Sequence, residues 1–156
     1  MALFRGITSL NLDGKGRLAI PTRHRDAFAE ENGRLIVTID IHERCLLIYP
    51  YLAWEEIERQ IDAVPTFNRQ ARRMKLMLVG HAEEATLDAA GRILIPAALR
   101  EYAGLEKAAV LVGQGKRLEL WDEVAWNRLR EEFLNDDVAD EAADFPLPAA
   151  LENLSL

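Results

Sequence analysis

Cysteine is nearly absent from this chain, since Cys45 is the single one among 156 residues. A framework of intrachain disulfides is therefore excluded, and a lone thiol fits a reducing compartment. Long apolar runs are missing too, and none approaches the roughly 20 residues that a membrane-spanning helix needs. Residues 1–6 lack the apolar core of a signal peptide. We expect a cytoplasmic protein that makes no membrane contact.

Sequence signatures of catalysis are also missing. The chain has no glycine-rich phosphate loop, no Gly-x-Ser-x-Gly and no His-Glu-x-x-His. Asp13 and Asp88 occupy equivalent places, but each is followed by Gly or Ala and has an arginine four residues later, unlike an aspartic protease dyad. We expect no enzyme activity, no cofactor and no small-molecule substrate.

The candidate metal ligands are His24, His42, His81 and Cys45. The segment from Asp40 through His42 to Cys45 lacks the paired spacing of a structural zinc site, so we expect no metal. Cys45 stands at the start of an apolar stretch, which favours a role in core packing.

Positive charge is scarce overall, because the net charge is −7, but it is unevenly distributed. Residues 1–75 carry a balance of +2 and residues 76–156 carry −9. The first 25 residues hold a single acid, Asp13, against five bases: Arg5, Lys15, Arg17, Arg23 and Arg25. The local field, and not the sum over the chain, decides whether a phosphate backbone is attracted. The N-terminal segment is therefore a candidate for contact with nucleic acid.

The chain does contain a ten-residue motif in two copies. Leu12–Pro21 reads LDGKGRLAIP, and Leu87–Pro96 reads LDAAGRILIP, 75 positions later. A repeat of this kind indicates a duplicated unit, most simply two half-domains related by a pseudo-two-fold axis.

The repetition continues beyond the motif. The two copies align at an offset of 75 positions through the first apolar segment and at an offset of 72 positions thereafter, because three residues are missing from the second copy. The corresponding pairs are Arg25 and Arg100, Leu35–Val37 and Val110–Val112, Leu46–Tyr49 and Leu118–Trp121, and Trp54 and Trp126. The two repeated tryptophans are expected to anchor helices in the core.

Each copy is predicted to run strand, tight turn, strand, short helix, two strands and a longer helix. The glycine that ends each turn can take positive φ, while Pro21 and Pro96 stop the second strand. Residues 34–40 and 45–49 are rich in β-branched and aliphatic side chains, which favours strands. An α+β fold follows from this order.

We divide the chain into a first repeat at 1–63, a connecting basic helix at 64–80, a second repeat at 81–134 and an acidic tail at 135–156. The tail is expected to be mobile, with a short helical piece. In the connecting helix three arginines share one face: Arg69, Arg72 and Arg73. A solvated or subunit-contact face is favoured there over a recognition helix, because no helix-turn-helix pattern precedes it, and both interpretations stay open.

In both copies an aspartate and an arginine flank the turn. Asp13 with Arg17, and Asp88 with Arg92, suit a structural role, because a carboxylate can accept backbone N–H bonds within the turn and pair with the arginine.

The two turns differ in charge. Lys15 in the first corresponds to Ala90 in the second, and the second motif follows the acidic pair Glu83–Glu84. A projecting β-ribbon can enter a major groove, with arginine reading guanine and lysine contacting phosphate. We hypothesise that the first hairpin binds DNA through Arg17 and Lys15, while the second mainly completes the fold.

The motif Leu-Asp-x-x-Gly-Arg-x-x-Ile-Pro resembles that of AbrB/SpoVT-type swapped-hairpin DNA-binding domains. Two copies in one chain, together with Phe4–Gly6, Gly80–Ala82 and Leu120–Asp122, resemble the MraZ family of bacterial transcription regulators over about Phe4–Trp126. The resemblance implies a mainly β, α+β fold, in which two pseudo-two-fold-related swapped-hairpin repeats interlock into one compact barrel-like domain with flanking helices.

The resemblance also implies a function. It implies a nucleoid-associated, sequence-specific DNA-binding regulator, often a repressor of its own division and cell-wall gene cluster. Members form ring-like homo-oligomers that bind short direct repeats of double-stranded DNA. The family's key arginine corresponds to Arg17, and the second pattern, Asp88 with Arg92, is interpreted as mainly structural. The candidate DNA-binding residues are Arg5, Asp13, Lys15, Arg17, Arg23 and Arg25.

A second hypothesis stays open, namely a non-catalytic oligomeric protein-interaction module whose basic rim binds an acidic partner. Salt dependence separates the two, because binding through several phosphates weakens by orders of magnitude as salt rises.

Overall fold

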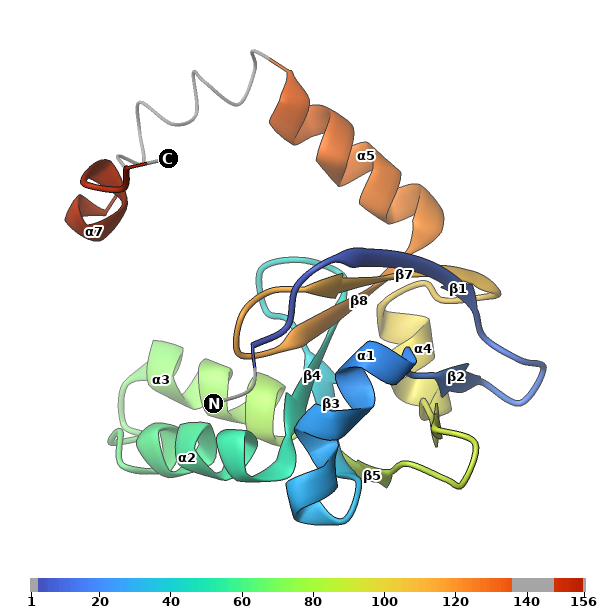
Figure 1. Ribbon diagram of the computed structural model, residues 1–156. Coiled ribbons are helices and arrows are strands. Elements are labelled where there is room, and N and C mark those ends of the chain that lie inside the picture. Colours follow the sequence, from blue (N-terminus) through green and yellow to red (C-terminus); the bar gives the residue numbers. More distant parts are fainter. Residues whose placement is uncertain (1–2, 136–147, 156) are drawn as a thin grey trace. The chain divides into compact units, whose positions relative to one another are not determined.

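The computed structural model describes residues 3–135 and 148–155 (Figure 1). The chain divides into two compact units, residues 1–123 and 124–156. Both sequence repeats contribute their strands to the first unit, so the fold that matters for the candidate site lies there.

The elements follow the predicted order in both copies. The first copy contains β1 (Ile7–Asn11), β2 (Arg17–Ala19), α1 (Thr22–Arg25), the 3-10 helix η1 (Asp26–Glu31), β3 (Arg34–Ile39), β4 (Leu46–Pro50) and α2 (Tyr51–Asp62). The second contains β5 (Glu83–Thr86), β6 (Arg92–Leu94), α4 (Ala97–Tyr102), β7 (Ala108–Gly113), β8 (Leu118–Asp122) and α5 (Glu123–Leu134).

The strands of the two copies interlock. The main sheet is antiparallel and has the order β1-β7-β8-β4-β3-β5, while β2 pairs with β6 in a separate two-stranded ribbon. Each strand has a counterpart in the other copy: β1 and β5, β2 and β6, β3 and β7, β4 and β8. When every strand is replaced by its counterpart, the strand order reads in reverse and all pairings are kept. The predicted pseudo-two-fold relation is thus present, and its axis passes between β4 and β8. Each copy's first strand pairs with the other copy, which confirms the predicted interlocking.

The predicted barrel is not seen. The six-stranded sheet stays open, with β1 and β5 as its edges. The β2–β6 ribbon pairs over only three residues, and Pro21 and Pro96, which lack a backbone N–H, follow soon after its strands. Neither β2 nor β6 pairs with a strand of the main sheet, so the main sheet does not continue through the ribbon. An α+β fold of two repeats is what the structure confirms.

The registers also correct the alignment of the repeats by one residue. In the β3–β4 and β7–β8 pairings, Leu35 is opposite Pro50 and Ala109 is opposite Asp122, the residue that corresponds to Pro50. Leu35–Val37 thus correspond to Ala109–Leu111, and the alignment with Val110–Val112 is wrong. One residue is missing from the second copy before β7, and two are missing from the turn between β7 and β8.

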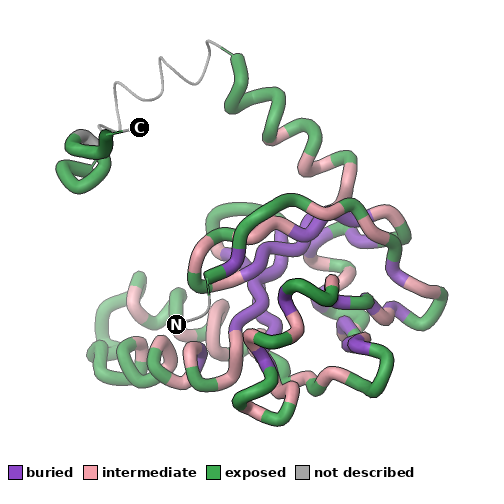
Figure 2. Tube along the Cα trace, in the orientation of Figure 1, coloured by how far each residue is buried: buried purple, intermediate pink, exposed green. Residues whose placement is uncertain are grey.

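The core lies between the two copies, and buried positions concentrate on the central strands (Figure 2). Trp54 and Cys45 are buried, as predicted. The prediction for Trp126 is wrong, because it is only partly buried, and none of the residues of α5, all of them described, is buried.

A helix joins the two copies, and it begins at Arg69, five residues after the start of the predicted range of 64–80. It consists of α3 (Arg69–Met74) and a π-helical turn, η2 (Lys75–Val79). The Asn68 side chain caps α3 by accepting the backbone N–H groups of Gln70 and Ala71 at 2.9 and 3.3 Å. The mobility predicted for 135–156 concerns residues that lie largely outside those described, and α7 (Ala149–Glu152) is the short helix within this segment. No helix in the described ranges is long and apolar enough to cross a membrane.

Candidate nucleic-acid interface

The β2–β6 ribbon presents a narrow outer face. Leu18 and Ile93 are paired across it and fully buried, so the alternate positions point outward. Arg17 is opposite Leu94, and Arg92 is opposite Ala19. The two tight turns that lead into β2 and β6 form the loops on the right of Figure 1. The ribbon therefore carries one arginine from each copy on its exposed side.

The first turn is closed by Asp13. The Asp13 backbone N–H donates to the Arg17 carbonyl at 2.9 Å, and the Gly16 N–H donates to the Asp13 carbonyl at 3.0 Å. Oδ1 of Asp13 accepts the backbone N–H groups of Lys15 at 2.9 Å and of Arg17 at 2.8 Å, while Oδ2 accepts Arg17 Nε at 2.7 Å. These bonds, the backbone N–H of Arg17 foremost, lower the pKa of Asp13 to about 2. Asp13 thereby fixes the orientation of the Arg17 side chain relative to the ribbon.

The second turn repeats this geometry. Oδ1 of Asp88 accepts the backbone N–H groups of Ala90 and Arg92, each at 2.9 Å, and Oδ2 accepts Arg92 Nε at 3.1 Å. The backbone N–H of Arg92 is the main cause that lowers the pKa of Asp88. The bonds expected from the structural interpretation are therefore present in both copies.

Each turn is also braced by an arginine of the other copy. The Arg100 guanidinium lies against Gly16 while its Nε donates to the Ile95 carbonyl at 3.0 Å. Arg25 mirrors this arrangement against Gly91, with Nε donating to the Ile20 carbonyl at 2.8 Å. Arg25, a candidate for DNA contact, is thus placed at the second turn. Sequence reasoning did not nominate Arg100 for the site, although its correspondence with Arg25 was the available signal.

The remaining basic candidates lie in different settings. Lys15 is exposed at the tip of the first turn, and its side chain forms no hydrogen bond or ion pair with any residue in the described ranges. Arg5 is exposed on the segment before β1. Arg23 is exposed but tied to the fold, because its Nε donates to His24 Nε2 at 3.3 Å and its guanidinium bonds the Thr8 hydroxyl.

The two turns differ in their charged surroundings. The strand that leads to the second turn, β5, carries exposed Glu83 and Glu84, and Glu84 pairs with Arg34 at 3.6 Å. The first turn has Lys15 at its tip where the second has Ala90, while each turn has one guanidinium at its base, Arg100 at the first and Arg25 at the second. The first turn therefore has the more positively charged surroundings of the two.

The histidines that were weighed as metal ligands, and rejected, do not join Cys45 in a cluster of donor atoms among the described residues. His24 is buried beside Phe4, with ring centroids 5.6 Å apart, and His81 Nδ1 lies 2.7 Å from the Met77 carbonyl oxygen. Burial, followed by the charge of Arg23, lowers the pKa of His24.

Cys45 instead lies between two buried carboxylates, which sequence reasoning did not find. They belong to Asp40 and Glu119. Burial, followed by the charges of Glu119 and then Asp40, raises the pKa of the Cys45 thiol. Because Glu119 is 74 positions from Cys45, only the pairing of β4 with β8 brings them together.

The fold and the ribbon define a class of protein in which two strand-turn-strand repeats exchange their first strands and expose a shared β-ribbon. Comparison with known proteins places the chain within that class. The family model described as "MraZ protein, putative antitoxin-like" matches residues 3–77 and again 78–145. The chain belongs to the MraZ family.

Relatives match over the full length. A protein of Halorhodospira halophila and one of Thioalkalivibrio sulfidiphilus are each 50% identical to this chain, covering 99% of it and 100% of their own length. A protein of Coxiella burnetii is 47% identical over the same shares. Each of these relatives bears the name "Transcriptional regulator MraZ".

Proposed function

We propose that this protein is a sequence-specific DNA-binding transcriptional regulator that does no catalysis. The observation that carries the proposal is the exposed β2–β6 ribbon, on which Asp13 fixes Arg17 beside the unpaired cation of Lys15. A two-stranded ribbon fits the major groove, where a preoriented arginine can bond guanine. The names of the full-length relatives support the same function.

The division of labour between the copies belongs to this proposal. Arg17 reads bases, Lys15 and Arg5 contact phosphates, and Asp13 positions Arg17. Asp88 and Arg92 mainly complete the second turn. Arg23 and Arg25 add positive charge behind the reading face, although both are also held by hydrogen bonds within the fold.

The biological setting is also proposed. The resemblance to the family supports a cytoplasmic, nucleoid-associated repressor of its own division and cell-wall gene cluster that recognises short direct repeats. A single small ribbon binds DNA weakly, but several ribbons on one oligomer raise the avidity by roughly 10²–10⁴. A ring-like homo-oligomer would supply such ribbons at regular spacing.

Exposed apolar side chains support self-association. Phe67 is 92% exposed, and it lines one surface groove together with the exposed apolar side chains of Val64 and Met74, between α2 and the connecting helix. Apolar surface of this kind on a folded protein marks contact sites. In this proposal the repeats comprise 1–63 and 81–134, with the helix of 64–80 between them and the tail of 135–156 after them.

Fluorescence anisotropy on DNA from upstream of the protein's own gene tests the proposal. Arg17→Ala removes a contact worth about 1–3 kcal/mol per ribbon, and in an oligomer the losses from all bound ribbons add up. We expect selective binding to be lost, while Arg92→Ala, the matched variant in the second turn, retains it.

Circular dichroism and light scattering should show both variants folded and with unchanged mass. Binding that is equal for scrambled DNA, or that is lost equally in the two folded variants, contradicts the assignment to the first hairpin. Binding that hardly changes between low and moderate salt favours the protein-interaction module instead.

A further inference from the structure

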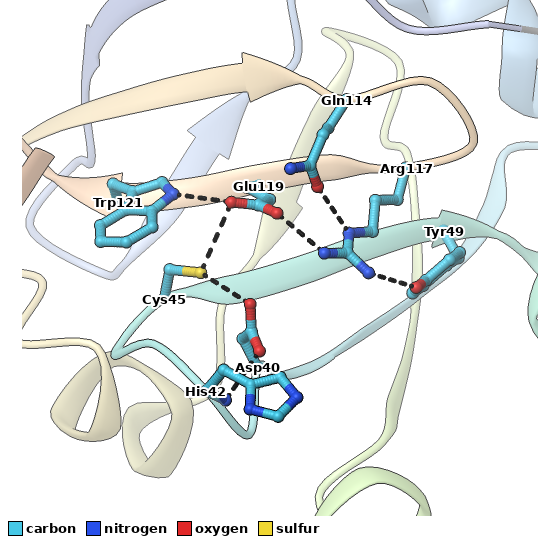
Figure 3. A network of polar contacts seen from close by, with 8 residues as sticks. All are labelled: Asp40, His42, Cys45, Tyr49, Gln114, Arg117, Glu119 and Trp121. Carbon is cyan, nitrogen blue, oxygen red and sulfur yellow. Dashed lines mark hydrogen bonds and ion pairs between the residues drawn. The ribbon is translucent and has the colours of Figure 1, made fainter. Parts of the chain in front are cut away.

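A thiol and two carboxylates are buried together where the two repeats meet (Figure 3). Asp40 follows β3 and is 9% exposed, Cys45 precedes β4 and is 0% exposed, and Glu119 on β8 is 6% exposed. Cys45 Sγ lies 3.8 Å from Asp40 Oδ2 and 3.9 Å from Glu119 Oε1, and one donor atom from each residue lies within 4.8 Å of the others. We call these three residues the Cys45 cluster.

The fold itself does not require the Cys45 cluster. The pseudo-two-fold axis supplies a corresponding location at the shorter turn between β7 and β8, where the Gln114 N–H donates to the Arg117 carbonyl at 2.9 Å as the Asp40 N–H donates to the Cys45 carbonyl at 3.0 Å. No donor set of this kind is present there. The corresponding residues are Gln114 for Asp40, Arg117 for Cys45 and Leu47 for Glu119. Because burying carboxylates costs free energy, their presence at one location and not the other points to a ligand.

The charges of the cluster are incompletely balanced. Glu119 Oε2 pairs with the Arg117 guanidinium at 2.9 Å, and Oε1 accepts the Trp121 indole N–H at 3.0 Å. Asp40 Oδ1 accepts the His42 backbone N–H at 2.9 Å, while its Oδ2 faces the thiol, a weak donor. Among the described residues the Asp40 carboxyl group forms no ion pair, whereas Glu119 has Arg117, so a cation beside Asp40 Oδ2 would supply the positive partner that Asp40 lacks.

We propose that Asp40, Cys45 and Glu119 bind one divalent transition-metal ion of the Zn²⁺ class, with water in the fourth position. Tetrahedral zinc, with bonds of about 2.3 Å to sulfur and 2.0 Å to oxygen, places those ligand atoms about 3.5 Å apart. The observed sulfur–oxygen distances exceed this by only a few tenths of an ångström. The sulfur ligand favours zinc over magnesium or calcium, which prefer oxygen.

Binding follows a balanced exchange. The Cys45 S–H proton leaves to solvent, a metal–sulfur bond forms, and one oxygen of each carboxylate replaces a water of the hydrated metal ion. Two carboxylates, one thiolate, the Arg117 guanidinium and the dication then sum to zero charge. Because Asp40 and Cys45 belong to the first repeat and Glu119 to the second, the ion fastens the two repeats beside the β4–β8 pairing.

Cobalt(II) is the probe of choice, since a cobalt–thiolate bond produces charge-transfer absorption in the near ultraviolet. Cys45 is the only cysteine among the 156 residues of the chain, so that absorption reports this site alone. We expect one Co²⁺ per chain with the thiolate band, displaced by Zn²⁺, and a higher melting temperature with Zn²⁺ bound. This measurement on the unmodified protein does not depend on whether any variant folds.

Variants then assign the ligands. Cys45→Ser should lose the band, and Asp40→Asn should weaken Co²⁺ binding by roughly tenfold or more. The matched control is Asp26→Asn, which changes an exposed aspartate on η1 and should bind as the unmodified chain does. The proposal is overturned if folded, unmodified protein shows no thiolate band at saturating Co²⁺, or if Cys45→Ser binds Zn²⁺ with unchanged affinity.

Discussion

At the scale of the residue, the two aspartates of the motif organise the turns. Each carboxylate accepts two backbone N–H groups and one arginine Nε, so its oxygen atoms are engaged before any ligand arrives. Such a residue acts on a ligand through the arginine that it holds. In the proposed function, Asp13 is therefore a positioning residue and Arg17 the one that touches DNA.

This arrangement makes one contribution of Asp13 to stability pH-dependent. Its pKa is about 2 in the folded chain, below its ordinary value of 3.8, so folding favours the ionised form. The stabilisation is fully present above about pH 4 and is lost as the pH falls through about 2. In urea titrations followed by circular dichroism, Asp13→Asn should be less stable than the unmodified chain at pH 6, and the difference should shrink toward pH 2.

Asp26→Asn, at an exposed position outside the motif, serves as the control for a general charge effect. A difference between Asp13→Asn and the unmodified chain that stays constant from pH 6 to pH 2 would contradict this account.

At the scale of the element, the turn conformation explains why the motif keeps its last glycine. Gly91 has φ of +75°, and a Cβ there would lie 2.3 Å from the Arg25 guanidinium. The guanidinium can shift, but the left-handed backbone itself costs an L-residue about 1–2 kcal/mol. We expect Gly91→Ala to lower the free energy of unfolding by that amount in urea titrations.

Gly14 offers a matched comparison. A Cβ at Gly14 has no neighbour within 4 Å, and its counterpart in the second turn is already Ala89. Gly14→Ala should therefore change the free energy of unfolding by less than about 0.5 kcal/mol. Equal losses in Gly14→Ala and Gly91→Ala would show that backbone conformation is not the cause.

The elements themselves could be predicted from the sequence, because local patterns define them. The turns, the strands at 34–40 and 45–49, and the helix before β5 all follow from glycine, proline and apolar spacing. What local patterns do not contain is pairing between distant strands. Three features depend on pairings between strands. These are the one-residue correction to the alignment of β7 with its counterpart β3, the open sheet, and the contact of Cys45 with Glu119. The repeated tryptophan also fails to predict a difference between the two helices. In α2 the residue Trp54 is buried, whereas α5 has no buried residue.

At the scale of the whole molecule, each copy depends on the other for its first strand. β1 pairs with β7, β5 pairs with β3, and β2 pairs with β6. A fragment of residues 1–80 would leave β1 and β2 without partners and expose core residues such as Leu18. We expect fragments 1–80 and 81–156 each to be unfolded as monomers and to regain sheet structure when mixed in equal amounts.

Circular dichroism and light scattering on the separate and mixed fragments measure this. A monomeric fragment 1–80 that unfolds cooperatively on its own would show that the exchange of strands is not needed for folding.

The exchange of β1 between the copies also sets the order of events during synthesis. The partner of β1 is translated about a hundred residues after it, so the N-terminal strand leaves the ribosome long before any strand can pair with it. The helices and the β3–β4 hairpin can form first, while β1 remains unpaired. The strand that leads into the proposed DNA-reading turn therefore joins the sheet only when β7 has left the ribosome, so a nascent chain cannot display a finished reading head before most of the protein has been made.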